Sequence, residues 1–360
     1  MDVSRFNTSF VWRGESPVFA SKFGSNALAW ADEDGYLCIR RSSSFSTTPQ
    51  LEIEAHANAI FDIVWSHDDR RIFTGSGDQT CSMFDPETGS RLAQFSGHNG
   101  SVKSVALRQD TSQIFATGAR DGHIFLWDAR SSSSEPLERL RNVHSYYPKK
   151  PSSRRRRRLP EDSQHSITSV TFMKDDYTLL SSGSVDGMVK LWDTRKLYYR
   201  KRPCPVREIR PSNETRRVGI TSMCLDSTNT RLLVSYYRTG KIRLFDLSAS
   251  PSNALICVFS GHKNDSFYVK SSFSPDERFV VSGSCDCGIY IWNLERNSSE
   301  RRRGSTVLPL QNPLRGHTQE VTCVDWRIGT AGDELVSCSD DGSVRIWTNF
   351  TDDDTNGSSS

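Results

Sequence analysis

The sequence contains no long run of apolar residues. No stretch approaches the roughly 20 apolar residues that span a bilayer, and residues 1–15 lack the apolar core of a secretory signal. We therefore expect no membrane partner and a location in the cytosol or nucleus. No acidic or nucleophilic cluster stands apart from the recurring motifs described below, so we expect no catalytic residues and no enzyme activity.

Cysteine is present but is not arranged for cross-links or for a metal. The nine cysteines are an odd number, and most lie inside apolar runs such as that around Cys38. This placement fits reduced, buried thiols in a reducing compartment. Cys285 and Cys287 lie close together, but no second Cys or His pair at metal-ligand spacing accompanies them. We therefore expect no metal and no other cofactor.

Charge is distributed unevenly, although the formal net charge of the chain is only +3. Residues 131–163 contain nine basic against four acidic residues, and residues 195–217 contain nine against two. Residues 296–303 add four basic against one acidic residue, so the rest of the chain has an excess of acidic residues. The sequence therefore predicts an acidic body that carries basic loops.

An internal repeat indicates the fold class. Each full copy has a Gly-His pair, two apolar strands and an Asp that is followed six residues later by Trp or Phe; the third copy runs from Gly97 to Trp127. Seven anchor positions mark the ends of the copies: Arg40, Phe84, Trp127, Trp192, Phe245, Trp292 and Trp347. The two shortest steps between anchors resemble the roughly 40–45-residue period of WD40 repeats, and the longer steps indicate insertions. We expect an all-β protein with one seven-bladed WD40 β-propeller over residues 1–350 and a short acidic and polar tail at 351–360.

The polar residues of the repeat have an architectural interpretation. In the third copy, His98, Thr117, Asp121 and Trp127 are expected to form one hydrogen-bonded chain, because a buried imidazole and a buried Trp N–H need partners. We expect the same chain in the sixth and seventh copies. A hydrolase triad would occur once, whereas this set recurs, which favours a structural role. The segment Phe6–Arg13 is expected to supply the outer strand of the last blade and so to close the ring.

Two successive copies carry an arginine two residues beyond the final Asp, at Trp127–Arg130 and Trp192–Arg195. These tetrapeptides resemble the WD-x-Arg box of substrate receptors for cullin-4 ubiquitin ligases, which dock on an adaptor called damaged-DNA-binding protein one. The resemblance implies the following adaptor-binding residues: Asp128, Arg130, Asp193 and Arg195. A rigid guanidinium at this position can bind a carboxylate or carbonyl groups of a partner. The alternative is an arginine that pairs only within its own blade.

Longer stretches resemble one family of such receptors, the denticleless/Cdt-two type. The matching stretches are Ala55–Asp62, Gly77–Thr80, Lys103–Ala106, Thr117–Gly122, Val185–Gly187, Lys190–Lys196, Gly261–Ser272 and Gly316–Thr322. The most specific of them is Gly261–Ser272. The resemblance implies a non-catalytic receptor that recruits replication licensing and cell-cycle factors for ubiquitination and degradation. Its substrates would carry a PCNA-binding degron presented on chromatin-bound PCNA. Members of this family often extend well past the propeller.

The resemblance also implies two binding faces. By the WD40 chain path, the Gly-His loops and Asp-Gly turns share one face, and Arg130 and Arg195 lie on the other. Degrons of this class carry a basic residue beyond the PCNA motif, which suits an acidic body. The candidate substrate-face residues are Asp32, Glu33, Tyr236, Tyr237, Asp265 and Glu320. The alternative for each of them is an ordinary solvated loop residue.

A run of basic residues lies between the third and fourth copies, in a Ser-rich stretch that predicts a disordered insert at about 131–163. Its cations are Lys149, Lys150, Arg154, Arg155, Arg156, Arg157 and Arg158. The run is typical of a nuclear localisation signal, so we expect the nucleus as location. Salt-dependent contact with DNA phosphates and a plain solvated charge run are the alternatives. Two other function classes stay open: a generic WD40 scaffold or histone-binding propeller, and a DNA-binding propeller.

Overall fold

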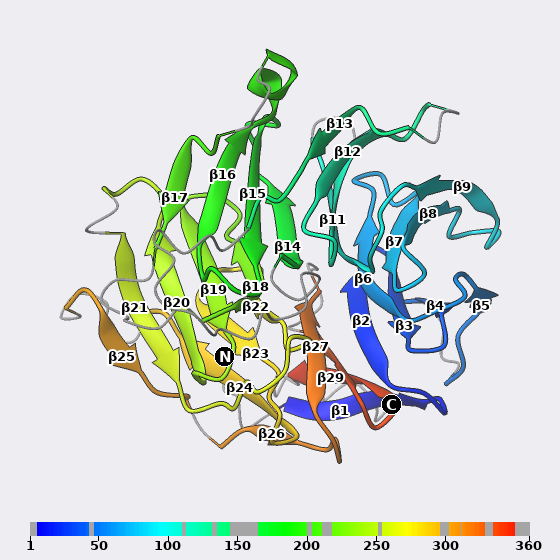
Figure 1. Ribbon diagram of the computed structural model, residues 1–360. Helices are drawn as coiled ribbons and strands as arrows, with labels where there is room; N and C mark the ends of the chain where they lie inside the picture. The colour runs from blue at the N-terminus through cyan, green and yellow to red at the C-terminus, as the bar shows by residue number, and fades with distance from the viewer. Residues whose placement is uncertain are drawn as a thin grey trace, which may run out of the picture.

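Seven β-sheets, built almost entirely from antiparallel strand pairs, follow one another around a common axis in the described part of the chain (Figure 1). The computed structural model describes residues 6–42, 47–109, 113–131, 135–144, 165–199, 204–210, 218–250, 254–295, 302–310, 312–327 and 334–349. Each sheet is one blade, with its first strand at the axis. The predicted all-β, seven-bladed WD40 propeller is therefore confirmed. None of the described helices is long and apolar enough to cross a membrane.

The strands of the first four blades run outward from the axis in chain order. Blade 1 consists of β2 (Val18–Phe23), β3 (Ala27–Asp32), β4 (Tyr36–Arg41) and β5 (Leu51–Glu54). Blade 2 consists of β6 (Ile60–Trp65), β7 (Ile72–Ser76), β8 (Thr80–Phe84) and β9 (Arg91–Ser96). Blade 3 consists of β10 (Val102–Leu107), β11 (Ile114–Ala119), β12 (Ile124–Asp128) and β13 (Glu138–Leu140). Blade 4 consists of β14 (Ile167–Phe172), β15 (Thr178–Gly183), β16 (Val189–Asp193), the 3-10 helix η3 (Thr194–Tyr199) and β17 (Arg207–Ile209).

The last three blades depart from this plan in different ways. Blade 5 consists of β18 (Ile220–Leu225), β19 (Arg231–Tyr236), β20 (Lys241–Asp246) and β21 (Leu255–Ser260), to which β25 (Ser305–Val307) adds in parallel. Blade 6 has the short strands β22 (Ser271–Phe273), β23 (Phe279–Ser282), β24 (Gly288–Asn293) and β26 (Leu314–Arg315). Blade 7 consists of β27 (Val321–Trp326), β28 (Glu334–Ser339), β29 (Ser343–Asn349) and, from the start of the chain, β1 (Phe6–Arg13).

Strand β1 closes the ring. It pairs antiparallel with β29, from Phe6 opposite Asn349 to Arg13 opposite Ser343 (Figure 1). The sequence-based prediction for this segment is therefore confirmed. The pairing covers an edge of β29 that would otherwise offer unpaired backbone groups to other chains.

The hydrophobic core lies between neighbouring blades. In one cluster, Ala116 and Leu126 of blade 3 are buried together with Val170, Leu179 and Trp192 of blade 4. This arrangement follows from the period of a strand, because alternate side chains point to opposite faces of each sheet. Each blade therefore contributes two apolar faces, one to each neighbour.

The predicted polar chain is present in blade 3. His98 Nδ1 lies 3.0 Å from Asp121, and its Nε2 lies 2.8 Å from Thr117 Oγ1. Trp127 Nε1 donates to the same hydroxyl at 2.8 Å. The equivalent chain joins four residues of blade 7: His317, Ser337, Asp341 and Trp347. The prediction is confirmed for both blades.

The same prediction is wrong for blade 6. Trp292 Nε1 donates to the backbone oxygen of Ser260 at 3.0 Å, and Asp286 accepts from the Tyr290 hydroxyl at 2.6 Å. Neither ring nitrogen of His262 has a hydrogen-bond partner among the described residues. The physical reason is Tyr290, whose hydroxyl takes the carboxylate that a histidine binds in the other blades.

The predicted disordered insert at 131–163 begins too early, because part of the segment before residue 145 is ordered. Strand β13 pairs with β12, and His144 is buried, 2.8 Å from Asp186 and 2.8 Å from Ser181. His144 is the histidine of blade 4, and it was missed because Val143 precedes it in place of glycine. Residues 145–164, which include Lys149, Lys150 and Arg154–Arg158, lie outside the described residues.

Candidate protein-binding site

The strand ends define two faces of the ring. On the upper face, the loops between blades meet the turns between second and third strands: Arg120 N donates to Ser101 O at 2.9 Å, and Asp340 N donates to Glu320 O at 3.0 Å. The lower face carries the opposite strand ends. There Ala129 N, just after β12, donates to Gln113 O, just before β11, at 2.7 Å.

The lower face carries the two arginines of the WD-x-Arg tetrapeptides. Arg130 Nε and Nη2 donate to the carboxylate of Asp128 at 3.0 and 2.7 Å, and 61% of the arginine side chain remains exposed. The hydrogen bonds from Arg130 lower the pKa of Asp128. Arg130 can still donate its remaining N–H groups to a partner, because its Nη1 makes no hydrogen bond within the described part of the chain. The same is true of Arg195.

Arg195 repeats this geometry one blade further on. Its Nε and Nη2 both lie 3.0 Å from the carboxylate of Asp193, and its guanidinium carbon lies 3.6 Å from the centre of the Tyr177 ring. The side chain is 60% exposed. Both arginines are thus held rigidly by their own blades, and more than half of each side chain faces solvent.

The mouth of the ring on the upper face is covered by aromatic rings from three blades. Tyr268, in the loop before β22, stacks on Phe19 with ring centres 5.0 Å apart and on Phe61 at 5.8 Å. Phe19 and Phe61 belong to the inner strands of blades 1 and 2 and stack on each other at 5.7 Å. The Lys103 ammonium lies 3.1 Å from the centre of the Phe61 ring. We call Phe19, Phe61, Lys103 and Tyr268 the mouth cluster.

Three sets of contacts hold the Tyr268 loop across the mouth. Asn264 Nδ2 donates to Thr221 Oγ1 at 3.0 Å, and Phe267 stacks on Tyr237 with ring centres 4.4 Å apart. Beyond Tyr268, the Lys270 ammonium reaches Asp62 of blade 2 at 2.9 Å. The loop therefore connects blade 6 to blade 5 on one side and to blade 2 across the ring.

Three carboxylates lie beside the mouth cluster on blades 7 and 1. We call Glu33, Glu320 and Asp340 the acid rim. Burial, together with the charges of Glu320 and Glu33, raises the pKa of Asp340 to about 6. The acid rim also acts on Tyr268, whose pKa is raised mainly by burial and further by these three carboxylates. An apolar platform beside three carboxylates suits a peptide that presents a basic side chain.

Four of the predicted substrate-face residues lie on the upper face. Glu33 and Asp265 are exposed, and Tyr237 and Glu320 are half-buried. Glu33 and Glu320 belong to the acid rim, whereas Tyr237 supports Phe267. Whether a partner binds them stays a prediction.

The other two predictions are wrong. Tyr236 is 2% exposed, with the Arg243 guanidinium 4.8 Å from its ring centre. Asp32 is 8% exposed, and its carboxylate accepts from Tyr36 N at 2.9 Å to stabilise the turn between β3 and β4. Both residues end a strand with their side chains turned into the blade.

Sequence reasoning missed the residues at the centre of the mouth: Phe19, Phe61, Lys103, Arg120, Tyr268 and Asp340. A signal was present, because several of them lie in the stretches that resemble the denticleless family. These residues lie near the beginnings of inner strands or in the turns beside those strand ends, close to the axis. This position could have been used to predict them.

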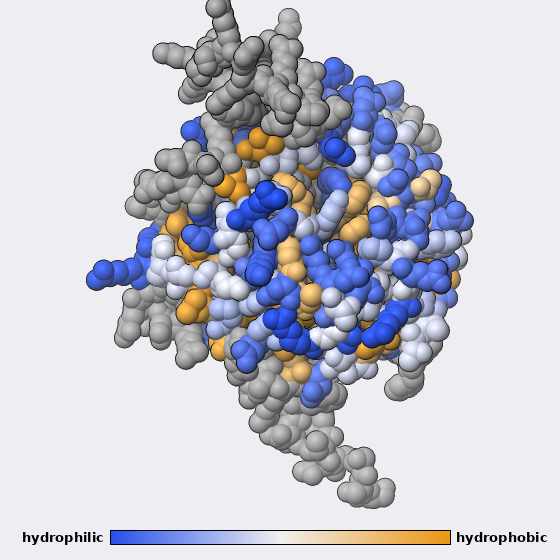
Figure 2. Space-filling model, turned by 60° about the horizontal axis from the view of Figure 1, so that its bottom comes forward, coloured by the Kyte–Doolittle hydropathy of each residue, from blue (hydrophilic) through white to orange (hydrophobic). Residues whose placement is uncertain are grey.

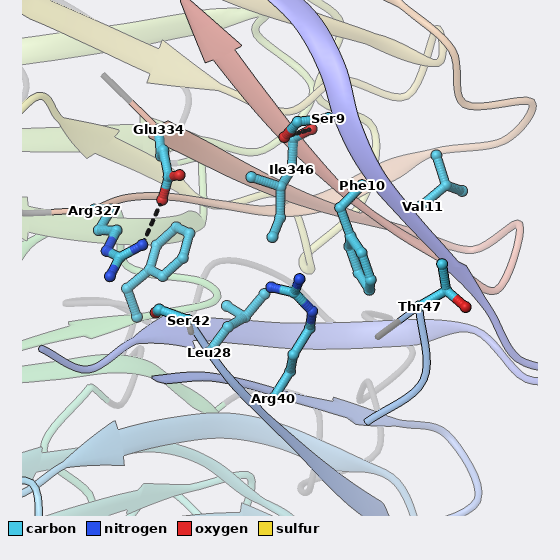
Figure 3. A pocket seen from close by; sticks show the side chains of 11 residues that line it. Ser9, Phe10, Val11, Leu28, Arg40, Ser42, Thr47, Arg327, Glu334 and Ile346 are labelled. Carbon is cyan, nitrogen blue, oxygen red and sulfur yellow. Dashed lines mark hydrogen bonds and ion pairs between the residues drawn. The ribbon is translucent and has the colours of Figure 1, made fainter. Parts of the chain in front are cut away.

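A cavity of about 420 Å³ lies at the seam between blades 7 and 1 (Figure 3). Arg40 lies 4.3 Å from the ring centre of Phe10, and Arg327 pairs with Glu334 at 2.8 Å. None of the predicted site residues lines this cavity.

On the side seen in Figure 2, hydrophilic residues cover most of the surface, and hydrophobic residues form separate small patches. The described ranges contain no group of three or more His, Cys, Asp or Glu residues that could hold a metal ion.

Comparisons with known proteins agree on the fold. The family model described as "WD domain, G-beta repeat" matches residues 253–293 and 308–348. The model "Nucleolar protein 10-like, N-terminal domain", a β-propeller model by its name, matches residues 57–245. Together the matched ranges cover most of blades 2 to 7.

Curated relatives identify the family. The chain is 39% identical over 343 residues to "Denticleless protein homolog" of Danio rerio, which covers 92% of this chain and 50% of the relative. It is 36% identical over 354 residues to the Homo sapiens homolog and 35% identical over 358 residues to "Protein lethal(2)denticleless" of Drosophila melanogaster. These matches cover 92% of this chain and 46% and 45% of the relatives, so the chain spans about half the length of the curated relatives it matches. Over its propeller, the chain belongs to the denticleless family of WD40 proteins.

Proposed function

We propose that this chain is the substrate-recognition subunit of a cullin-4 RING ubiquitin ligase. Its lower face binds the adaptor, damaged-DNA-binding protein one, through Arg130 and Arg195. Its upper face binds a degron that is presented on chromatin-bound PCNA. The chain forms no covalent bond itself, because ubiquitin transfer belongs to other subunits. Its substrates are replication licensing and cell-cycle factors, and its location is the nucleus.

The observation that carries the proposal is the pair of exposed guanidiniums on one face of successive blades. Each is fixed by its own aspartate, so little side-chain entropy is lost when a partner binds. The mouth cluster and acid rim lie on the opposite face. Adaptor and substrate can therefore bind at the same time, which a bridging subunit requires. The acid rim suits the basic residue that follows the PCNA motif in degrons of this class.

The test is affinity purification of wild type beside Arg130→Ala/Arg195→Ala, with partners identified by mass spectrometry. We expect the double variant to lose the adaptor and cullin-4 while its thermal unfolding stays unchanged. Arg278→Ala is a matched control, because Arg278 also pairs with an aspartate of its own blade on the lower face, at 2.6 Å. Undiminished adaptor recovery by the double variant would remove the proposed function.

A second function is favoured by the mouth itself. An acid rim beside aromatic rings would also bind the basic tail of a histone, as in a generic WD40 scaffold or chromatin-binding propeller. This alternative gains support if the double arginine variant keeps every partner.

Direct DNA binding by Arg154–Arg158 is tested by reversing their charges and measuring duplex affinity at moderate salt. The same variant tests the nuclear localisation signal through the location of the tagged protein.

A further inference from the structure

The mouth of the ring has a second charged side, which differs in sign from the acid rim. Lys103 is the second residue of the inner strand of blade 3, and Arg120 lies in the upper turn of the same blade. The Lys103 ammonium contacts the rings of Phe61 and Tyr268, at 3.1 and 5.2 Å from their centres. We call Lys103 and Arg120 the basic side of the mouth.

These two cations lack a counter-ion within the described residues. Neither side chain makes a hydrogen bond or ion pair there, and the nearby carboxylates are already engaged. Asp121 accepts from the His98 ring and Asp62 from Lys270. Burial and the charge of Arg120 lower the pKa of Lys103 to about 8, which is the expected result of placing two cations together without an anion.

The order of the blades separates the two charges. Glu320 and Asp340 belong to blade 7 and Glu33 to blade 1, whereas the basic side belongs to blade 3. Phe19, Phe61 and Tyr268 lie between them. A segment that crosses this platform would meet carboxylates at one end and cations at the other.

We infer that the basic side binds the carboxylate of an Asp or Glu in the same segment whose basic residue faces the acid rim. The inference rests on the proposed function, because it concerns the segment that the upper face binds. An arginine and a lysine around one carboxylate give charge-assisted hydrogen bonds in a partly dry site. A phosphate group carries about −1.5 to −2 charge at neutral pH, so the acid rim would repel it more strongly than a carboxylate. The structure therefore favours a carboxylate as the ligand of Lys103 and Arg120.

The first test is selection from a displayed library of random dodecapeptides with the full chain as bait. Wild type is expected to select one acidic and one basic residue at a fixed separation. Lys103→Gln/Arg120→Gln is expected to lose the acidic preference and to keep the basic one. Removing two cations from the lower face, by Arg70→Gln/Lys174→Gln, is the matched control and leaves both preferences unchanged. An acidic preference that is absent in wild type, or unchanged in the mouth variant, overturns the inference.

The second test is titration of one selected peptide and two derivatives. Replacing its acidic residue by the amide weakens binding to wild type about tenfold, which corresponds to one charge-assisted hydrogen bond. The same replacement has a smaller effect on binding to Arg120→Gln, which keeps only Lys103 and changes an exposed position where misfolding is not expected. Lys103→Arg keeps the affinity of wild type. A phosphoserine derivative that binds more tightly than the acidic peptide would overturn the assignment to a carboxylate.

The two proposals fail in different ways. A wild type that selects the basic residue but no acidic residue leaves the receptor function intact and removes only this inference. If wild type selects no peptide consensus, this inference fails, whereas the substrate part of the proposed function concerns a degron presented on PCNA and is not measured by free peptides. The adaptor part is measured separately, through Arg130→Ala/Arg195→Ala.

Discussion

Blades 3 and 6 both contain a His, a hydroxyl residue, an Asp and a Trp at corresponding positions, and of these two only blade 3 joins them. His98, Asp121 and Trp127 are linked through hydrogen bonds of 2.8 to 3.0 Å, whereas His262 in blade 6 has no hydrogen-bond partner within the described ranges. Blade 6 also has the shortest inner strand, the three residues of β22. The residues that would extend this strand form the loop that places Tyr268 on the mouth.

This difference separates scaffold from site. A complete polar chain ties the loop before the inner strand to the turn of its own blade, as in His98 with Asp121. In blade 6 the His–Asp tie is missing, although Lys263 still bonds Ser284 and Cys285 of the turn. The loop adds contacts to other blades: Asn264 on Thr221, Phe267 on Tyr237 and Lys270 on Asp62. The blade that lacks the His–Asp hydrogen bond is the one that supplies Tyr268, at the centre of the candidate binding face.

The largest effect on stability is expected in blade 3, where the polar chain is complete. Trp127→Ala should destabilise the fold by about 3–5 kcal/mol, as for other buried aromatics, because Trp127 is 1% exposed and donates to Thr117. Chemical denaturation of wild type and variant measures this change. Equal unfolding midpoints would contradict the place of Trp127 in the core.

The repeat made much of this fold predictable. Spaced anchors such as Trp127 and Trp347 located the third strands, and the residual strand Phe6–Arg13 could only pair at the ring closure. The strand period does not tell which way a residue at a strand end turns, so Asp32 and Tyr236 were placed wrongly on the surface. The predictions for Arg130 and Arg195 gave the correct face, since the end of a third strand fixes it.

The mouth could not be predicted from the repeat. Tyr268 contacts Phe19 and Phe61, which lie about 200 or more residues away in the sequence and on blades across the ring. Such contacts depend on how the loop before β22 leaves its blade. Neither the strand period nor the anchor spacing predicts the path of such a loop.

A smaller effect separates the two histidines. His98→Ala removes the hydrogen bonds of the imidazole to Asp121 and Thr117, each worth about 0.5–3 kcal/mol, the larger figure applying to the charged partner. His262→Leu removes two buried ring nitrogens that have no partner in the described structure, so its stability should equal or exceed that of wild type. Thermal unfolding of both variants measures the contrast. A similar loss in the two variants would show that blade 6 is tied after all.

The last expected effect is the acid response of blade 6, which appears only at low pH. Burial lowers the pKa of His262 to about 4, below the ordinary value of 6.5, so the unfolded chain binds more protons between these two values. Folding stability must therefore fall as the pH drops from about 6.5 to about 4, because protonation favours the unfolded state. His262→Leu should lose less stability than wild type over this range, whereas above pH 7 the stability of both proteins should depend on pH in the same way. Parallel curves for the two proteins down to pH 4 would mean that His262 has a charge partner in the folded state, and that blade 6 resembles blade 3 more closely than its contacts indicate.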